Sequence, residues 1–146
     1  MATAWILVAN ASEAKVYSNK GINKGLEIVA SLSHPDSRKK TSDLVSDRPG
    51  HMPGAGNGHG SHIPLTDPKQ NEHGIFAREL AHQLDQGRTS NSYQRLIVVA
   101  EPHFRGLLNG AMNSQVSGLV SDTIDKDYTK LSGKDLATHL EKVIYL

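Results

Sequence analysis

The chain has 146 residues, of which 37% are hydrophobic and 21% charged, and a chain of this length usually forms one domain with one core. It contains no cysteine, which excludes disulfides, iron–sulfur clusters, Cys-ligated zinc and thiol catalysis. Its 16 Lys and Arg residues nearly balance its 15 Asp and Glu residues, so binding to nucleic acid would require a local basic patch.

Three short segments near the start of the chain have the pattern of β-strands. Residues 5–9 form a continuous apolar run, which is typical of a central strand buried on both faces. Residues 14–18 and 26–32 alternate apolar and polar side chains, as half-buried strands do. The connections between the segments are too short for parallel crossovers, so we predict an antiparallel meander.

Residues 33–66 are rich in Ser, Asp, Gly, His and Pro and show no sustained hydrophobic period. We predict one long loop here, with a turn of helix around residues 42–45. A loop of this length is uncommon inside a compact domain and is usually functional or disordered. We therefore place the functional centre in its Gly- and His-rich part, residues 49–66.

A helix is predicted directly after this loop, with Asp67 as its N-cap and Pro68 as its first residue. Apolar residues recur along it with helical spacing, and a glycine is expected to end it. The buried stripe is Phe76, Leu80 and Leu84, flanked by Ala77 and Ala81, and the terminal glycine is Gly87.

The rest of the chain alternates strands and helices. Residues 95–100 repeat the apolar pattern of the first strand and are expected beside it and parallel to it,. Pro102 opens a second helix, residues 118–124 form the last strand, and Ser132 to Asp135 start a final helix. The expected inward residues are Phe104, Leu107, Leu108, Ala111 and Met112 in the second helix, and Leu136, Leu140, Val143 and Ile144 in the final one.

The predicted order is therefore β-β-β-α-β-α-β-α, within a single domain spanning residues 1–146. A meander followed by α/β crossovers indicates the α/β class and fits a ribonuclease-H-like three-layer sandwich with a mixed five-stranded sheet. The chemistry of a ribonuclease-H-like nuclease needs several carboxylates around two Mg²⁺ ions. The first strand carries none, and Glu13 and Glu101 are scattered, which favours ordinary solvated acidic residues.

The loop histidines raise a second metal hypothesis, a site with nitrogen ligands only. His51, His59 and His62, with His73 beyond them, are separated by a Gly-rich stretch that would be costly to order. We therefore expect a mobile polar loop, no metal and no cofactor. A Ser–His–Asp triad is also not supported, because the chain has no Gly-x-Ser-x-Gly elbow.

The loop instead suits contact with a large anion such as RNA or another phosphate compound. Five glycines expose backbone N–H groups, and the start of the following helix adds partial positive charge. The alternative is a solvated face whose basic residues are partly cancelled by acidic ones. The glycines are Gly50, Gly54, Gly56, Gly58 and Gly60, the basic residues Arg38, Lys39, Lys40 and Arg48, and the acidic ones Asp36, Asp43 and Asp47.

Polar residues cluster just past the third strand, where Arg–carboxylate pairs would either anchor the base of the loop or contact a ligand. Both interpretations stay open. The cluster is His34, Ser37, Arg38, Asp43, Asp47 and Arg48, and with Gly50, His51, His59 and His62 it makes up the predicted ligand-binding set.

The start of the chain lacks the basic region of a signal peptide. No run of about 18 apolar residues occurs that would suggest a membrane-spanning helix. We therefore expect a cytoplasmic protein without membrane or DNA-specific partners.

Several motifs together resemble the bacterial host attachment protein family. They are Trp5-Ile-Leu-Val-Ala-Asn10, His34-Pro-Asp-Ser-Arg38, Ser42-Asp-Leu-Val-Ser-Asp-Arg-Pro-Gly50, Phe76-Ala-Arg-Glu-Leu80 and Ile124-Asp-Lys-Asp127. That family is in turn similar to the middle domain of eukaryotic and archaeal peptide-chain release factors. In those factors a Gly-Gly-Gln loop, before a helix of Phe-Ala-Arg type, promotes hydrolysis of peptidyl-tRNA in the ribosome. This chain has no Gly-Gly-Gln, so peptide release is not carried over.

Three functions follow as hypotheses. We favour a non-catalytic or weakly catalytic domain associated with RNA or the ribosome, with residues 49–66 as its probe. The second is a hydrolase acting on tRNA-linked or phosphoester substrates, with a loop histidine as general base. The third is a protein-interaction module with an indirect role in attachment to host cells.

Overall fold

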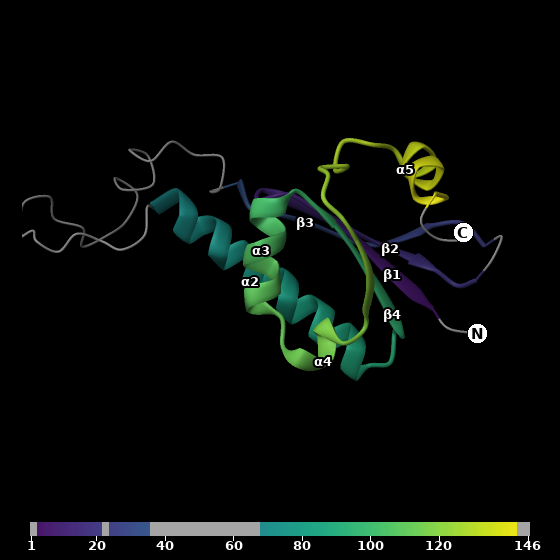
Figure 1. Ribbon diagram of the computed structural model, residues 1–146, viewed down its shortest axis with the longest axis horizontal. Helices are drawn as coiled ribbons and strands as arrows, with labels where there is room; N and C mark the ends of the chain where they lie inside the picture. Colours follow the sequence, from purple (N-terminus) through teal and green to yellow (C-terminus); the bar gives the residue numbers. More distant parts are fainter. Residues whose placement is uncertain (1–2, 22–23, 36–67, 143–146) are drawn as a thin grey trace, which may run out of the picture.

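The computed structural model describes residues 3–21, 24–35 and 68–142. They form one mixed sheet with the strand order β3-β2-β1-β4-β5 (Figure 1). The first three strands form the predicted antiparallel meander, and β4 and β5 run parallel to β1. The strands are β1 (Ala4–Ala9), β2 (Glu13–Asn19), β3 (Glu27–Ser33), β4 (Arg95–Ala100) and β5 (Val120–Ile124).

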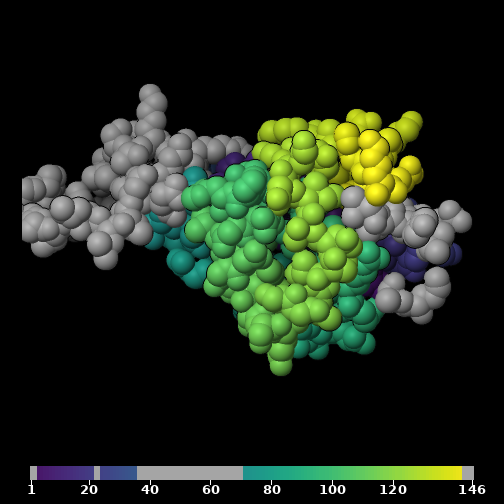
Figure 2. Space-filling view, in the orientation of Figure 1, coloured from purple at the N-terminus to yellow at the C-terminus, as the bar shows by residue number. Residues whose placement is uncertain are grey.

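Helices cover both faces of the sheet, which gives the predicted three layers (Figure 1). One face packs against α2 (Pro68–Thr89), α3 (Pro102–Ala111) and α4 (Ser114–Ser117). The other face packs against α5 (Gly133–Leu140). On the molecular surface, α3 lies next to the segment that carries β5 (Figure 2).

The two central strands supply both cores, because successive side chains of a strand point to opposite faces. Leu7 and Val98 are fully buried on the α2 side, while Ile6 and Ile97 are fully buried on the α5 side. The apolar runs in residues 5–9 and 95–100 therefore predicted strands buried on both faces correctly. The α/β class and the mixed five-stranded sheet are confirmed, and the ribonuclease-H-like assignment stays a prediction.

The predicted buried stripe of α2 is also confirmed, since Phe76, Leu80 and Leu84 are each at most 1% exposed. The predicted end of this helix at Gly87 is wrong. The helix continues to Thr89, and its C-terminus is closed by bonds from the Ser92 N–H to the Gly87 carbonyl (2.8 Å) and from the Asn91 N–H to the Arg88 carbonyl (3.0 Å). Asn91 has φ 57° and occupies the left-handed position that glycine usually takes after a helix.

Gly87 has a different role, which is to allow close packing. A Cβ atom at this position would lie 2.5 Å from the ring of Trp5, far inside contact distance. The Trp5 ring also stacks on Tyr93, with ring centroids 4.7 Å apart. The glycine is therefore required by the approach of α2 to β1 and not by the turn.

The remaining helices agree with prediction in part. Ser132 caps α5 by accepting a hydrogen bond from the Asp135 N–H, as predicted. In α3, Phe104 and Leu108 are buried, but Leu107 and Ala111 are only partly so. The short α4 was not predicted, and Val143 and Ile144 lie outside the described residues.

Candidate functional site at the carboxyl edge of the sheet

Strands β1, β3, β4 and β5 all run in one direction, so their carboxyl ends meet at one edge of the sheet. We call this the carboxyl edge. In open α/β sheets, ligands bind outside the carboxyl ends of the strands. Four polar residues follow the strands here: Asn10 after β1, His34 after β3, Glu101 after β4 and Asp125 after β5.

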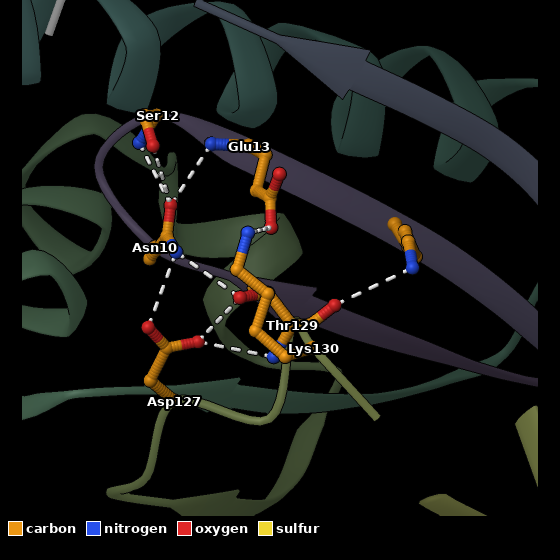
Figure 3. Close-up of polar contacts among 7 residues, drawn as sticks. Asn10, Ser12, Glu13, Asp127, Thr129 and Lys130 are labelled. Atoms are coloured by element: carbon orange, nitrogen blue, oxygen red, sulfur yellow. Dashed lines mark hydrogen bonds and ion pairs between the residues drawn. The ribbon is translucent and has the colours of Figure 1, made fainter. Parts of the chain in front are cut away.

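Asn10 connects two segments that are far apart in the sequence (Figure 3). Its Oδ1 accepts hydrogen bonds from the Ser12 N–H (2.9 Å), the Ser12 hydroxyl (3.1 Å) and the Glu13 N–H (2.9 Å). Its Nδ2 donates to Asp127 Oδ2 and to Thr129 Oγ1, both at 3.1 Å. The Asn10 amide thus uses both its donors and its acceptor, and it ties the β1–β2 turn to the segment between β5 and α5.

Asp127 is held as an anion within this network. Its Oδ1 accepts from the Thr129 N–H (3.0 Å) and the Thr129 hydroxyl (2.6 Å). Partial burial raises the pKa of Asp127, but the hydrogen bonds from Thr129 and Asn10 and the charge of Lys130 outweigh it and leave the pKa below its usual value,. Thr129 is only 1% exposed, so this part of the network belongs to the protein interior.

Two lysines extend the same network. Lys130 Nζ lies 3.0 Å from Glu13 Oε1 (Figure 3). Lys15 Nζ donates a hydrogen bond to the Thr129 carbonyl at 3.4 Å. The charges at this point are therefore paired with the chain's own groups. We call the network of Asn10, Ser12, Glu13, Asp127, Thr129 and Lys130 the Asn10 network.

A second long-range tie joins β3 to α2. His34 Nε2 lies 2.7 Å from Glu72 Oε2, and the two side chains are 17% and 11% exposed. The His34 ring also stacks on Phe76, with centroids 5.6 Å apart and planes inclined by 14°. Since residues 36–67 connect β3 to α2, this pair joins the two positions that flank that segment.

Glu101 and His103 lie at the start of α3. The Glu101 carboxylate caps the helix by accepting from the Phe104 N–H (2.6 Å) and the His103 N–H (3.0 Å). The rings of His73 and His103 meet edge to face, with centroids 6.3 Å apart. His103 of α3 therefore lies close to His73, the residue that follows Glu72 on α2.

Most of the predicted ligand-binding residues fall outside the described part of the chain. Of that set His34 is described, and it is paired with Glu72. The others lie in residues 36–67, namely Ser37, Arg38, Asp43, Asp47, Arg48, Gly50, His51, His59 and His62. Three of the four histidines in the metal hypothesis lie there too, while the fourth, His73, lies on α2. Within residues 3–21, 24–35 and 68–142, no three His, Asp or Glu side chains gather closely enough to hold a metal ion.

Asn10, Glu72 and Asp127 were not among the residues predicted for the site. A signal for Glu72 was present, because it precedes Phe76, Leu80 and Leu84 at helical spacing and so lies on the buried face of α2. Asn10 and Asp127 both belong to motifs that carried the family resemblance. Their pairing depends on β1 and β5 ending at the same edge, which no local pattern reveals.

The described helices include none that is long and apolar enough to cross a lipid bilayer. The class of the protein is α/β, with a mixed five-stranded sheet. Polar residues follow four of its strands at the carboxyl edge. The chain belongs to the family described as "Protein required for attachment to host cells", whose model matches residues 5–140. The predicted family resemblance is confirmed.

The fold is similar to that of an archaeal translation termination factor, aRF1, with a TM-score of 0.60 and 12% sequence identity. The match covers 97% of this chain and 35% of the termination factor, so this chain spans about a third of that protein. A second solved structure, of an archaeal protein, has a TM-score of 0.49 and 14% identity and covers 98% of this chain and 35% of its own. At such identities the likeness concerns the fold alone. No curated protein matches this chain significantly.

Proposed function

We propose that this protein is a cytoplasmic, non-catalytic or weakly catalytic domain that binds ribosomal RNA through residues 36–67. The observation that carries the proposal is the His34–Glu72 pair, which holds both flanks of that segment at the carboxyl edge. A segment anchored at both flanks can present its side chains to a large partner with less loss of entropy than a free one.

The composition of the segment supports an anionic partner. Arg38, Lys39 and Arg48 lie within it, together with three histidines and five glycines. Glycine-rich backbone allows close approach to phosphate groups, and cationic side chains neutralise them. The likeness in fold to a translation termination factor adds a reason to look for the partner in the ribosome. In this proposal any effect on attachment to host cells is indirect.

Co-sedimentation with purified ribosomes at low and high salt tests the proposal. We expect binding that weakens steeply as salt rises, because each phosphate contact releases counterions. Replacing Arg38 and Arg48 with alanine should weaken binding and reduce the slope of log affinity against log salt by about 1 for each lost contact. Lys134→Ala is the matched control, since Lys134 is an exposed cation on α5.

Two results would overturn the proposal. One is a lack of co-sedimentation of the wild-type chain at low salt. The other is equal loss of binding in the Lys134→Ala control, which would indicate general charge attraction without a site. Association that survives nuclease treatment would instead favour a protein partner and the interaction-module hypothesis.

A further inference from the structure

The two edges of the sheet differ in chemistry. At the β5 edge, Arg95 donates to Ser121 Oγ (2.7 Å) and to Asp122 Oδ2 (2.9 Å), and Arg105 pairs with Asp125. The β3 edge carries a single charged residue, Glu27, followed by six residues without charge or proline. Charges and prolines are the usual means by which proteins keep an edge strand from pairing with another chain.

The β3 edge also carries exposed apolar side chains. Among the residues that the structure describes, the exposed large hydrophobic side chains are Ile28 at 60% and Val29 at 47%. Ile28 lies opposite Tyr17 in the sheet, and a bulge places Val29 between Ile28 and Ala30 without a partner on β2. Because Tyr17 belongs to the α5-side core, Ile28 extends that apolar surface to the edge of the sheet.

We propose that β3 pairs antiparallel with β3 of a second copy of this chain, which joins the two five-stranded sheets into one. The charges of the strand favour this partner and this direction. A two-fold axis places Glu27 of each copy beside the uncharged end of the other strand, so no like charges lie opposite each other. Parallel pairing in register would instead bring the two Glu27 carboxylates together.

The pairing has a consequence for the candidate site. Antiparallel strands run in opposite directions, so the carboxyl edges of the two copies lie on opposite sides of the joined sheet. Each copy keeps its own His34–Glu72 pair and Asn10 network away from the joined strands. The dimer is therefore compatible with the proposed RNA contact and does not depend on it.

Sedimentation equilibrium over a range of concentrations tests the dimer. A seven-residue strand spans only about 23 Å, so we expect a concentration-dependent dimer. Ile28→Lys should raise the dimer dissociation constant about tenfold or more, because it puts a charge where apolar surface is buried. Thr123→Lys, on the opposite edge strand, is the matched control and should leave the constant unchanged. A wild-type chain that is monomeric at all concentrations overturns the proposal.

The lack of cysteine in the chain permits a second test that does not depend on a disruptive variant. Single cysteines at residues 28 to 33 should form disulfide-linked dimers under oxidising conditions, most rapidly at positions near the two-fold axis. Thr123→Cys should not. Dimers linked equally well through residue 123, or a dimer that persists in Ile28→Lys, would place the interface elsewhere and overturn the proposal. Ribosome binding can fail without changing either result.

Discussion

The two long-range ties at the carboxyl edge differ in what they connect. The Asn10 network joins two described segments through an amide whose hydrogen-bonding groups are all used. The His34–Glu72 pair is a single short contact between a ring nitrogen and a carboxylate oxygen, and it joins the flanks of residues 36–67. An amide network whose hydrogen bonds are all made stabilises the edge itself, whereas a largely buried histidine–carboxylate contact that joins the two flanks of a long segment fixes the positions of those flanks. We therefore assign scaffolding to the first and positioning to the second.

The largest expected effect comes from breaking the buried pair. Glu72→Ala removes the hydrogen-bond partner of the largely buried His34 ring and should lower the free energy of unfolding by about 3 kcal/mol. Glu72→Gln keeps a hydrogen-bonding group at the same place and should cost clearly less. Urea unfolding measures both. If the two variants lose the same stability, the charge of the pair contributes nothing and its assigned role is wrong.

Removal of the Asn10 side chain should cost somewhat less. Asn10→Ala removes the hydrogen bonds that the Asn10 amide makes to Ser12, Glu13, Asp127 and Thr129, and we expect a loss of about 2 kcal/mol. If Asn10 is only a scaffold, ribosome binding at a temperature where the variant stays folded should be unchanged. A loss of binding without a loss of stability would move Asn10 into the binding surface.

Asn10→Asp tests the same position by charge. The new carboxylate would lie beside the anionic Asp127, which is unfavourable at neutral pH. We expect the variant to be less stable than wild type at pH 7 and to recover part of the difference as the pH falls and one carboxyl takes up a proton. A difference in stability that does not change with pH would contradict the hydrogen-bond geometry of the network.

Asp127 itself should make a smaller contribution that depends on pH. Its pKa is lowered in the folded state, so its stabilising effect is complete above the unfolded value of about 3.9 and is lost as the pH falls through the folded value. Asp127→Asn should therefore flatten the acid limb of the stability curve. Acid titration of the two proteins followed by circular dichroism measures this, and identical acid limbs would be the contrary result.

The smallest effect is expected on α3, away from both ties. Gly106 lies in the helix with open space where a Cβ atom would project. Gly106→Ala should therefore raise stability by roughly 0.5–1 kcal/mol, because alanine has the higher helix propensity. Thermal unfolding measures the change, and a loss of stability would show that the helix surface is less open than described.

Much of the fold followed from local sequence patterns. Apolar runs over residues 5–9 and 95–100 predicted the buried central strands, and the spacing of Phe76, Leu80 and Leu84 predicted the buried face of α2. The end of α2 was mispredicted, because Gly87 was interpreted as a turn residue while its actual role is contact with Trp5. Asn91 takes the left-handed position instead, as asparagine can. In a sequence, a glycine that is needed for a close tertiary contact looks the same as a glycine that is needed for a turn.

The candidate site was less predictable than the fold. His34 was identified from a polar cluster after β3, but its partner Glu72 lies 38 residues further on. Asn10 and Asp127 are separated by 117 residues and meet only through the strand order. Polar contacts between the ends of different strands depend on topology and register, so a single sequence indicates the residues but not their pairing.

The close packing of Gly87 against Trp5 has a mechanical consequence for the other end of α2. A helix of 22 residues is about 33 Å long and bends little. It is seated on β1 near its last turn and tied to β3 near its first turns by Glu72. A helix fixed at two such distant points acts as a rigid strut, so the position of its first residue, Pro68, is set by the whole sheet.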